Sequence, residues 1–278
     1  MTTPKAKLAG LALIAALCAG FISGPTAPAR AGLDEGVAAY IRGDYATANR
    51  EWRPLAKQGN AKAQFSLGFM YDNGLGVTQD YAKAVGWWRK AAEQGYAKAQ
   101  HNLGLMYDNG LGVPQDYAKA VKWYRKAAEQ GYADAQFNLG VMYSDGQGVP
   151  QDDAEAVRWY RKAAEQGLAI AQFILGDKYS EGRGVSKDYV ETVRWLRKAA
   201  EQGFAVAQHN LGLMYGNGQG VPEDYVQAHM WFNLAASRYP PGEDRDKVVE
   251  VRDIAAERMT PAQISESQKL AREWKPKK

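Results

Sequence analysis

The residue types that most often carry chemistry are few and widely spaced in this chain of 278 residues. Its three histidines, His101, His209 and His229, include no HExxH pair and no other short-range pair of metal ligands. One aspartate recurs at the same position of each 36-residue repeat, so its copies lie a full period apart. Helix capping explains each of them without acid-base work. These aspartates are Asp80, Asp116, Asp152, Asp188 and Asp224. The sequence therefore predicts no catalytic residue, no metal site and no cofactor.

Glycine pairs such as Gly110 and Gly112 resemble phosphate-binding loops only superficially. They lie between two helical patterns and lack the preceding strand that such loops need, and the chain contains no P-loop, GxSxG or dinucleotide motif. Arg-Lys pairs also recur, each followed by a glutamate four residues after the arginine, which is typical of a solvated helix face. The arginines are Arg89, Arg125, Arg161 and Arg197.

The elements that carry these residues follow an internal repeat of 36 residues. Five copies begin, without insertions, at Ala61, Ala97, Ala133, Ala169 and Ala205. In the second copy, residues 97–107 show the spacing of a first helix, residues 110–114 form a loop of glycine and proline, and a second helix runs from about Asp116 to Glu129. Gly131 then ends it.

The repeat unit AxAQxxLGxxYxxGxGVxxDxxxAxxWxxKAAEQG resembles the Sel1-like repeat, a relative of the tetratricopeptide repeat. The resemblance implies an all-α fold, a right-handed α/α solenoid of helix-loop-helix repeats with helical caps. Residues 32–60 are expected to form an N-terminal capping half-repeat, because Gly43 to Ala46 lie one period before the corresponding residues of the first copy. Residues 61–240 are expected to hold the five repeats and residues 241–278 a C-terminal helical cap. Thr260, Pro261 and Gln263 have the pattern of a helix start.

Positions that stay constant among the copies are best explained by packing. A glycine inside each first helix costs about 1 kcal/mol relative to alanine, which close helix packing would justify. These are Gly68, Gly104, Gly140, Gly176 and Gly212. A tryptophan on each second helix is expected to lock neighbouring units together, with an aromatic ligand cage as the alternative. These are Trp87, Trp123, Trp159, Trp195 and Trp231.

Positions two, five and nine of each copy vary and lie along one face of the first helix. In tetratricopeptide-like arrays that face lines the concave groove, so the resemblance implies a protein-binding surface there. Aromatic residues and scattered charges suit such a surface, although position five has partial burial in the core as an alternative. The candidates are Lys62, Phe65, Phe69, Lys98, His101, Leu105, Asp134, Phe137, Val141, Ile170, Phe173, Asp177, Val206, His209 and Leu213. Asn102, Asn138 and Asn210 are further candidates, as clamps on a ligand backbone.

The amino-terminal 31 residues have the pattern of a secretory signal peptide, with Lys5 and Lys7 before an apolar stretch too short to span a bilayer. Cleavage is expected after Ala29 or Ala31 and removes Cys18, the only cysteine. A lipid anchor on Cys18 is the alternative, but Leu17 stands where lipoprotein signals have a small residue. The mature chain would have 32 basic and 31 acidic residues, which gives no reason to expect a nucleic-acid partner. It would contain no transmembrane segment and would be periplasmic.

The family resemblance implies a non-enzymatic scaffold or adaptor of the bacterial envelope. Its partner would be another protein or peptide, held in the groove, and its role would be to regulate a membrane sensor or an envelope complex. Two alternatives remain at this point. One is hydrolysis of β-lactams or cell-wall substrates, proposed for some secreted relatives that carry cysteine pairs absent here, and the other is a secreted effector directed at a host.

Overall fold

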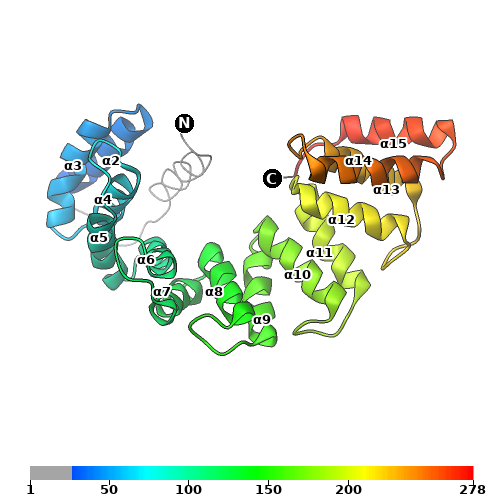
Figure 1. Ribbon diagram of the computed structural model, residues 1–278. Coiled ribbons are helices and arrows are strands. Elements are labelled where there is room, and N and C mark those ends of the chain that lie inside the picture. Colours follow the sequence, from blue (N-terminus) through cyan, green and yellow to red (C-terminus); the bar gives the residue numbers. More distant parts are fainter. Residues whose placement is uncertain (1–26, 278) are drawn as a thin grey trace. The chain divides into compact units, whose positions relative to one another are not determined.

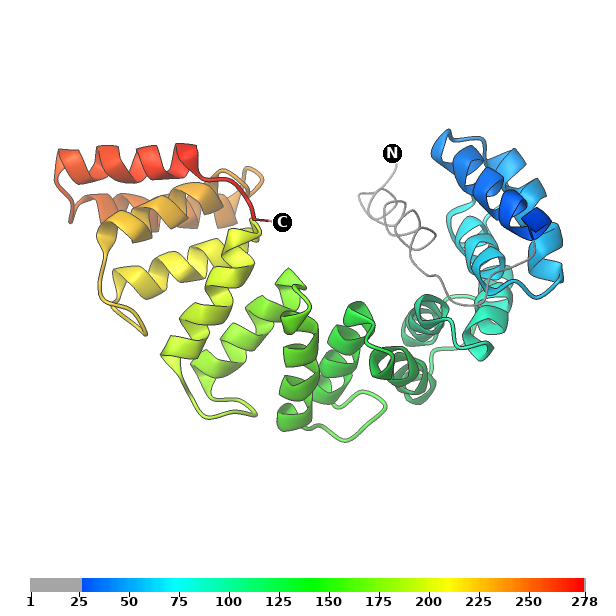
Figure 2. The same cartoon turned by 180° about the vertical axis from the view of Figure 1, so that it is seen from behind.

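The computed structural model describes residues 27–277, and their regular structure consists of fourteen helices without a strand (Figure 1). Residues 1–26, which include Cys18 and most of the expected signal peptide, lie outside the described residues. The two helices of a repeat lie side by side, as Figure 2 shows. The first pair is α2 (Ala27–Ile41) and α3 (Tyr45–Lys57), and the last two helices are α14 (Glu243–Ala256) and α15 (Pro261–Glu273). The five repeats between them supply α4 (Ala61–Asn73), α5 (Tyr81–Glu93), α6 (Ala97–Asn109), α7 (Tyr117–Glu129), α8 (Ala133–Asp145), α9 (Asp153–Glu165), α10 (Ala169–Glu181), α11 (Tyr189–Glu201), α12 (Ala205–Gly216) and α13 (Tyr225–Ala236).

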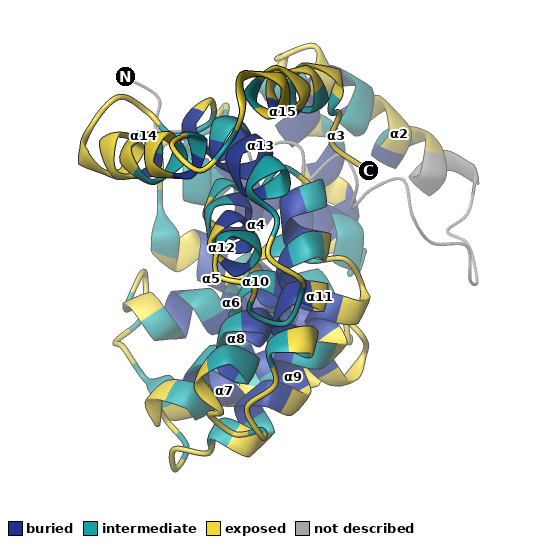
Figure 3. Ribbon diagram, turned by 90° about the vertical axis from the view of Figure 1, so that its right-hand side faces the viewer, coloured by how far each residue is buried: buried dark blue, intermediate teal, exposed yellow. Residues whose placement is uncertain are grey.

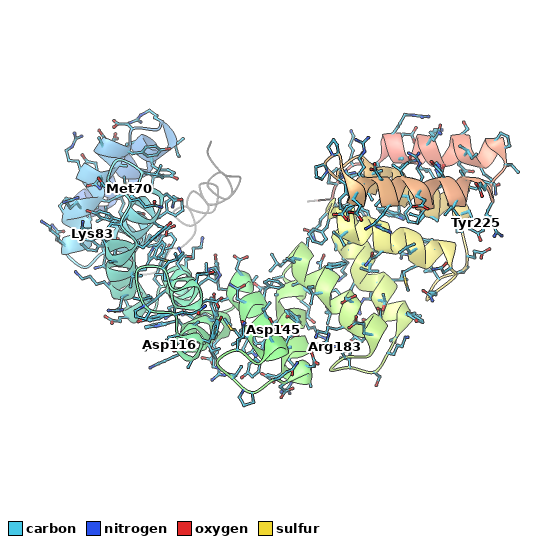
Figure 4. All side chains as sticks on the ribbon, in the orientation of Figure 1. Met70, Lys83, Asp116, Asp145, Arg183 and Tyr225 are labelled. Carbon is cyan, nitrogen blue, oxygen red and sulfur yellow. The ribbon has the colours of Figure 1, made fainter. Side chains whose placement is uncertain are left out.

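The helix ends follow from a few residue types. Asp116, labelled in Figure 4, accepts a hydrogen bond from the backbone N–H of Lys119 and caps α7, and the equivalent aspartates cap the other second helices in the same way. This confirms the capping role predicted from the sequence. Helix α6 ends at Gly110, whose left-handed backbone (φ 66°) lets its N–H reach the carbonyl of Met106. Thr260 and Gln263 form the predicted capping box of α15.

Contacts of constant residues hold helix pairs and junctions together within each unit. A Cβ atom on Gly104 would lie 2.5 Å from the Tyr124 ring, so glycine is what allows α6 to approach α7, as predicted. At the junction, the Arg89 guanidinium donates to the Tyr107 hydroxyl of the next repeat at 3.0 Å. The same bond is made by Arg53, Arg161 and Arg197 to tyrosines 18 residues later. These arginines therefore join repeats and do not merely form a solvated face.

Buried glutamines make a second set of junction contacts. The Gln100 side chain donates to the carbonyl of Ala92 in the preceding repeat and accepts from Gln130 at the end of its own repeat. In the fifth repeat the glutamine at that last position is replaced by Arg238, and the Gln208 side-chain oxygen, buried, has no hydrogen-bond partner in the described part of the chain. The regular array therefore ends there in its contacts as well as in its residues.

The chain folds into two compact units, each with its own core. The first extends to Ala135 and includes Gly146–Pro150, and the second holds Gln136–Asp145 and Gln151 onward. In the first unit, the fully buried Trp52 of α3 donates to the carbonyl of Leu33 in α2. Helix α2 begins at Ala27, earlier than the half-repeat expected from residue 32.

The second unit ends with α14 and α15, which both pack against α13. Phe232 and Val248 share one buried cluster, and Trp231 packs edge-on against Trp274 at the end of α15. Figure 3 shows that α14 is mostly exposed, whereas α13 is mostly buried. Among the described helices, none is both long enough and apolar enough to cross a membrane.

Candidate functional site

The candidate residues at position five of each repeat pack against aromatic rings. Phe65 lies 5.3 Å from the Tyr96 ring, Phe137 5.7 Å from that of Tyr160, and Phe173 5.5 Å from that of Phe204. Tyr160 comes from the second helix of the same repeat. Tyr96 and Phe204 are the last residues of their repeats. Position five therefore contributes to the core of each repeat, which was the alternative stated for it, and only part of these side chains is left for a partner.

His101 shows the strongest burial among the polar candidates. Its ring lies 5.8 Å from that of Tyr124 and 5.2 Å from that of Tyr132, and only 9% of the residue is exposed. Burial lowers the pKa of His101, so the imidazole is neutral at pH 7. Asn102, expected to clamp a ligand, lies 3.3 Å from the His101 ring nitrogen through its side-chain oxygen. Neither residue presents a free acid or base.

The candidates at positions two and nine are more accessible in the second unit. Ile170 of α10 and Val206 and Leu213 of α12 are 38%, 37% and 37% exposed, more than the other apolar candidates at positions two, five and nine. Phe69, at position nine of the first repeat, is buried beside Tyr40, whereas Leu105 and Val141 are half-buried. The first helices thus offer an apolar surface mainly on α10 and α12.

Position two carries a charged residue in each repeat that begins in the first unit. Lys62 and Lys98 are half-buried and Asp134 is exposed. Burial lowers the pKa of Lys98, while the nearby carboxylate of Asp134 raises it. In the second unit, Asp177 of α10 is half-buried, and burial raises the pKa of its carboxyl group. Position two therefore changes from charged to apolar between the two units.

Two polar clusters were not found by reasoning from the sequence. In the second unit, the buried Lys178 ammonium donates to Asp153 and, at 2.9 Å, to the Ser144 hydroxyl, and Arg183, labelled in Figure 4, lies 3.4 Å from Asp153. The repeat register contained the signal, because other repeats have methionine and tyrosine at the positions of Lys178 and Asp153. The cluster replaces an apolar contact by an ion pair.

The second cluster joins α13 to α15. The Ser267 hydroxyl lies 2.7 Å from His229 Nδ1, and Asn233 Nδ2 lies 3.1 Å from the same nitrogen. Ser267 is fully buried and His229 is 4% exposed, so no substrate can reach the pair in this arrangement. Among the described residues, no three His, Cys, Asp or Glu side chains come together in a group that could hold a metal.

Comparisons with known proteins agree with this architecture. The family model of the Sel1 repeat matches five consecutive segments, residues 61–96, 97–132, 133–168, 169–204 and 205–239. A protective antigen of uropathogenic Escherichia coli with an SLR fold is 38% identical over 88% of this chain, with a TM-score of 0.79. The match covers 53% of that protein, so the chain spans about half its length.

A Sel1 repeat protein from Oxalobacter formigenes is similar over nearly its whole length. It is 35% identical, with a TM-score of 0.73, and the match covers 86% of this chain and 98% of that one. Comparison with curated proteins finds no match.

Proposed function

Because the chain belongs to the Sel1 repeat family, we propose that it is a scaffold or adaptor that binds a segment of another protein and has no enzymatic activity of its own. Proteins of this family generally mediate protein–protein interaction and are typically non-catalytic. The fold supports such a role, since a row of similar helices presents side chains at regular spacing to an extended ligand.

The observation that carries the proposal is the exposed apolar surface of α10 and α12. Ile170, Val206 and Leu213 leave more than a third of their surface in water, although each side chain gains about 1.5–3 kcal/mol when fully buried. A partner that covers them would recover part of this free energy. Phe173 and His209, half-buried on the same helices, and Asp177 would form the border of the contact. We propose that the first-unit candidates Lys62, Lys98, Leu105 and Asp134 form a less apolar contact surface within that unit, and that Val141 of α8 contributes to the surface of the second unit.

Photo-crosslinking in cells tests this face. A photoreactive residue at Val206 is expected to capture a discrete partner. The same residue at Val190, which is 64% exposed but lies on the second helix of its repeat, serves as the control. Capture from Val190 equal to or stronger than capture from Val206 would show that the first helices do not form the binding surface.

The envelope location is part of the same proposal. We propose export, cleavage after Ala29 or Ala31, and a periplasmic adaptor that regulates a membrane sensor or an envelope complex. Cell fractionation and N-terminal sequencing of the accumulated protein test this, and an uncleaved protein in the cytoplasmic fraction would refute it. Hydrolysis of a β-lactam or of a peptidoglycan fragment by the purified protein would refute the non-enzymatic assignment.

A further inference from the structure

An open pocket of about 420 Å³ lies in the first unit, between the side of α3 and the loop that follows α4. Three cationic side chains, Arg50, Arg53 and Lys57, contribute to its wall, and none of the residues that line it is acidic. Ala46, Pro54 and Val77 supply apolar surface. The pocket is thus positively charged on one side and apolar on the other.

The pocket arises where α3 departs from the pattern of the later repeats. One period after α3, Lys90 lies 4.6 Å above the ring of Trp87 on α5, and both are absent from α3, which has Pro54 and Glu51 instead. Lys57 stands where the first four full repeats have a glutamate, so the charge at this position is reversed. These glutamates are Glu93, Glu129, Glu165 and Glu201.

Arg53 is held in place by two hydrogen bonds. Its Nε donates to the Asn49 side-chain oxygen at 3.1 Å, and its Nη2 donates to the Tyr71 hydroxyl at 3.1 Å. A guanidinium has five N–H donors in a rigid plane, so most of them remain for a ligand, and a fixed side chain loses little entropy on binding. Arg50 forms a surface pair with Glu51 at 3.3 Å, and because its side chain is 71% exposed this is a weak interaction.

Asn49 is a further departure from the repeat pattern in the wall of this pocket. It is 9% exposed, lines the pocket, and its side-chain NH2 group has no hydrogen-bond partner in the described part of the chain. Four of the five full repeats have valine at this position. The NH2 group has almost no accessible surface, so Asn49 acts on the pocket through its side-chain oxygen, which accepts from Arg53 Nε and holds the guanidinium in place.

We propose that this pocket binds a carboxylate side chain of an acidic peptide segment. A carboxylate is planar and accepts two parallel hydrogen bonds from a guanidinium, which suits the prearranged Arg53. The methylene groups of an Asp or Glu side chain fit the apolar wall formed by Pro54 and Val77. Because the pocket is open along α3, a peptide can lie across it with its backbone in solvent. This site lies in the first unit and does not depend on the face formed by α10 and α12.

The test is binding of a fluorescent decamer of glutamate to the purified protein at 150 mM salt, with unlabelled glutamate decamer, a glutamine decamer and inorganic phosphate as competitors. Lys57→Glu restores the residue found in the full repeats and is expected to weaken binding at least tenfold, whereas Lys57→Arg is expected to retain it. Asn49→Val, also a repeat residue, is expected to weaken binding about threefold or more. Lys122→Glu is the matched control, since Lys122 occupies the equivalent of Arg50 on the exposed surface of α7, and a change below twofold is expected.

Several outcomes would overturn the proposal. Absence of glutamate-decamer binding to the unmodified protein would do so, as would an equal loss in Lys122→Glu, which would indicate attraction without a defined site. Displacement of the peptide by phosphate at lower concentration than by free glutamate decamer would assign the pocket to phosphate instead. Self-association of the protein that Lys57→Glu abolishes, measured by light scattering, would assign it to a second copy of the chain. Thermal unfolding of each variant verifies that it is folded.

Discussion

Gly86 of α5 and Gly104 of α6 both lie inside a helix, and of these two only Gly104 is required by packing. A Cβ on Gly104 would meet the Tyr124 ring at 2.5 Å, whereas a Cβ on Gly86 would have nothing within 4 Å. We expect Gly104→Ala to lower the free energy of unfolding by about 1–3 kcal/mol, because the ring must move. Gly86→Ala should raise it by about 0.5–1 kcal/mol through helix propensity. Urea denaturation measures both, and effects of the same sign would contradict the packing role.

The aromatic candidates show where residue type alone is insufficient. An aromatic residue suits both a core and a binding surface, so the sequence pattern left two interpretations for position five. Its ring partners decide between them: Tyr96 for Phe65, Tyr132 for His101 and Phe204 for Phe173. These partners follow the end of the second helix, and only the three-dimensional turn of the chain brings them back to the first helix. The constant glycines were predictable because every copy keeps them.

His101 should make stability depend on pH. Burial lowers its folded-state pKa below the ordinary value of about 6.5, so the unfolded chain binds a proton more readily and stability falls as the pH drops below about 6.5. His101→Phe introduces the residue of the first, third and fourth repeats and should reduce the loss of unfolding free energy between pH 7 and pH 5. His209 and His229, whose pKa values are also lowered by burial, keep part of the dependence. An unchanged pH profile in urea denaturation would show that His101 does not titrate as its burial implies.

At the scale of elements, the junction of α9 and α10 differs from the others in the chemistry of its contact. Asp153 and Lys178 form an ion pair where the preceding repeats have a tyrosine and a methionine, and Ser144 of α8 also accepts from the lysine. Lys178 is buried and the Asp153 side chain is 27% exposed, so the lysine charge is largely withdrawn from water, and such a pair seldom adds stability. The buried Lys178 charge needs the Asp153 carboxylate beside it, so any arrangement of α9 and α10 that separates the two residues is disfavoured.

The expected result of breaking the pair follows from this. Asp153→Asn should lower the free energy of unfolding by about 3 kcal/mol, because it leaves the buried Lys178 charge without its carboxylate. The double variant Asp153→Tyr with Lys178→Met restores the residues of the other repeats and should be within about 1 kcal/mol of the original protein. Thermal and urea unfolding of the single and double variants provide the comparison. A double variant less stable than the single one would mean that the ion pair itself holds the two helices together.

Helix α15 is expected to close the array through a small number of contacts. Trp274 packs against Trp231. The Arg238 guanidinium carbon lies over the Trp274 ring, 4.5 Å from its centre. Because Trp274 is only half-buried, Trp274→Ala should cost about 2 kcal/mol, less than a fully buried tryptophan. Lys269→Ala on the same helix, 68% exposed, should change stability by less than about 0.5 kcal/mol. Hydrogen exchange of α13 amides reports the local effect, and unchanged exchange in Trp274→Ala would contradict a closing role for α15.

At the scale of the whole molecule, the 36-residue period was enough to predict the repeated helix pairs, because five copies keep apolar, glycine and capping residues at the same positions. The division into two compact units near Ala135 was not predictable. The residues that end the second repeat, Gln130 and Gly131, are the same as those that end the first and third. No residue of this ending therefore marks the boundary between the two units.

Repeat arrays are stabilised by contacts between neighbours, so a local change should remain local. Gly104→Ala should accelerate amide exchange in α4 to α7 and leave α12 and α13 protected as before. Gly212→Ala, where a Cβ would lie 2.6 Å from the Phe232 ring, should have the opposite distribution. Hydrogen exchange followed by mass spectrometry resolves both regions in one experiment. If either variant accelerates exchange equally in all helices, the two compact units unfold as one cooperative body, and stability in this protein is global despite its repetitive contacts.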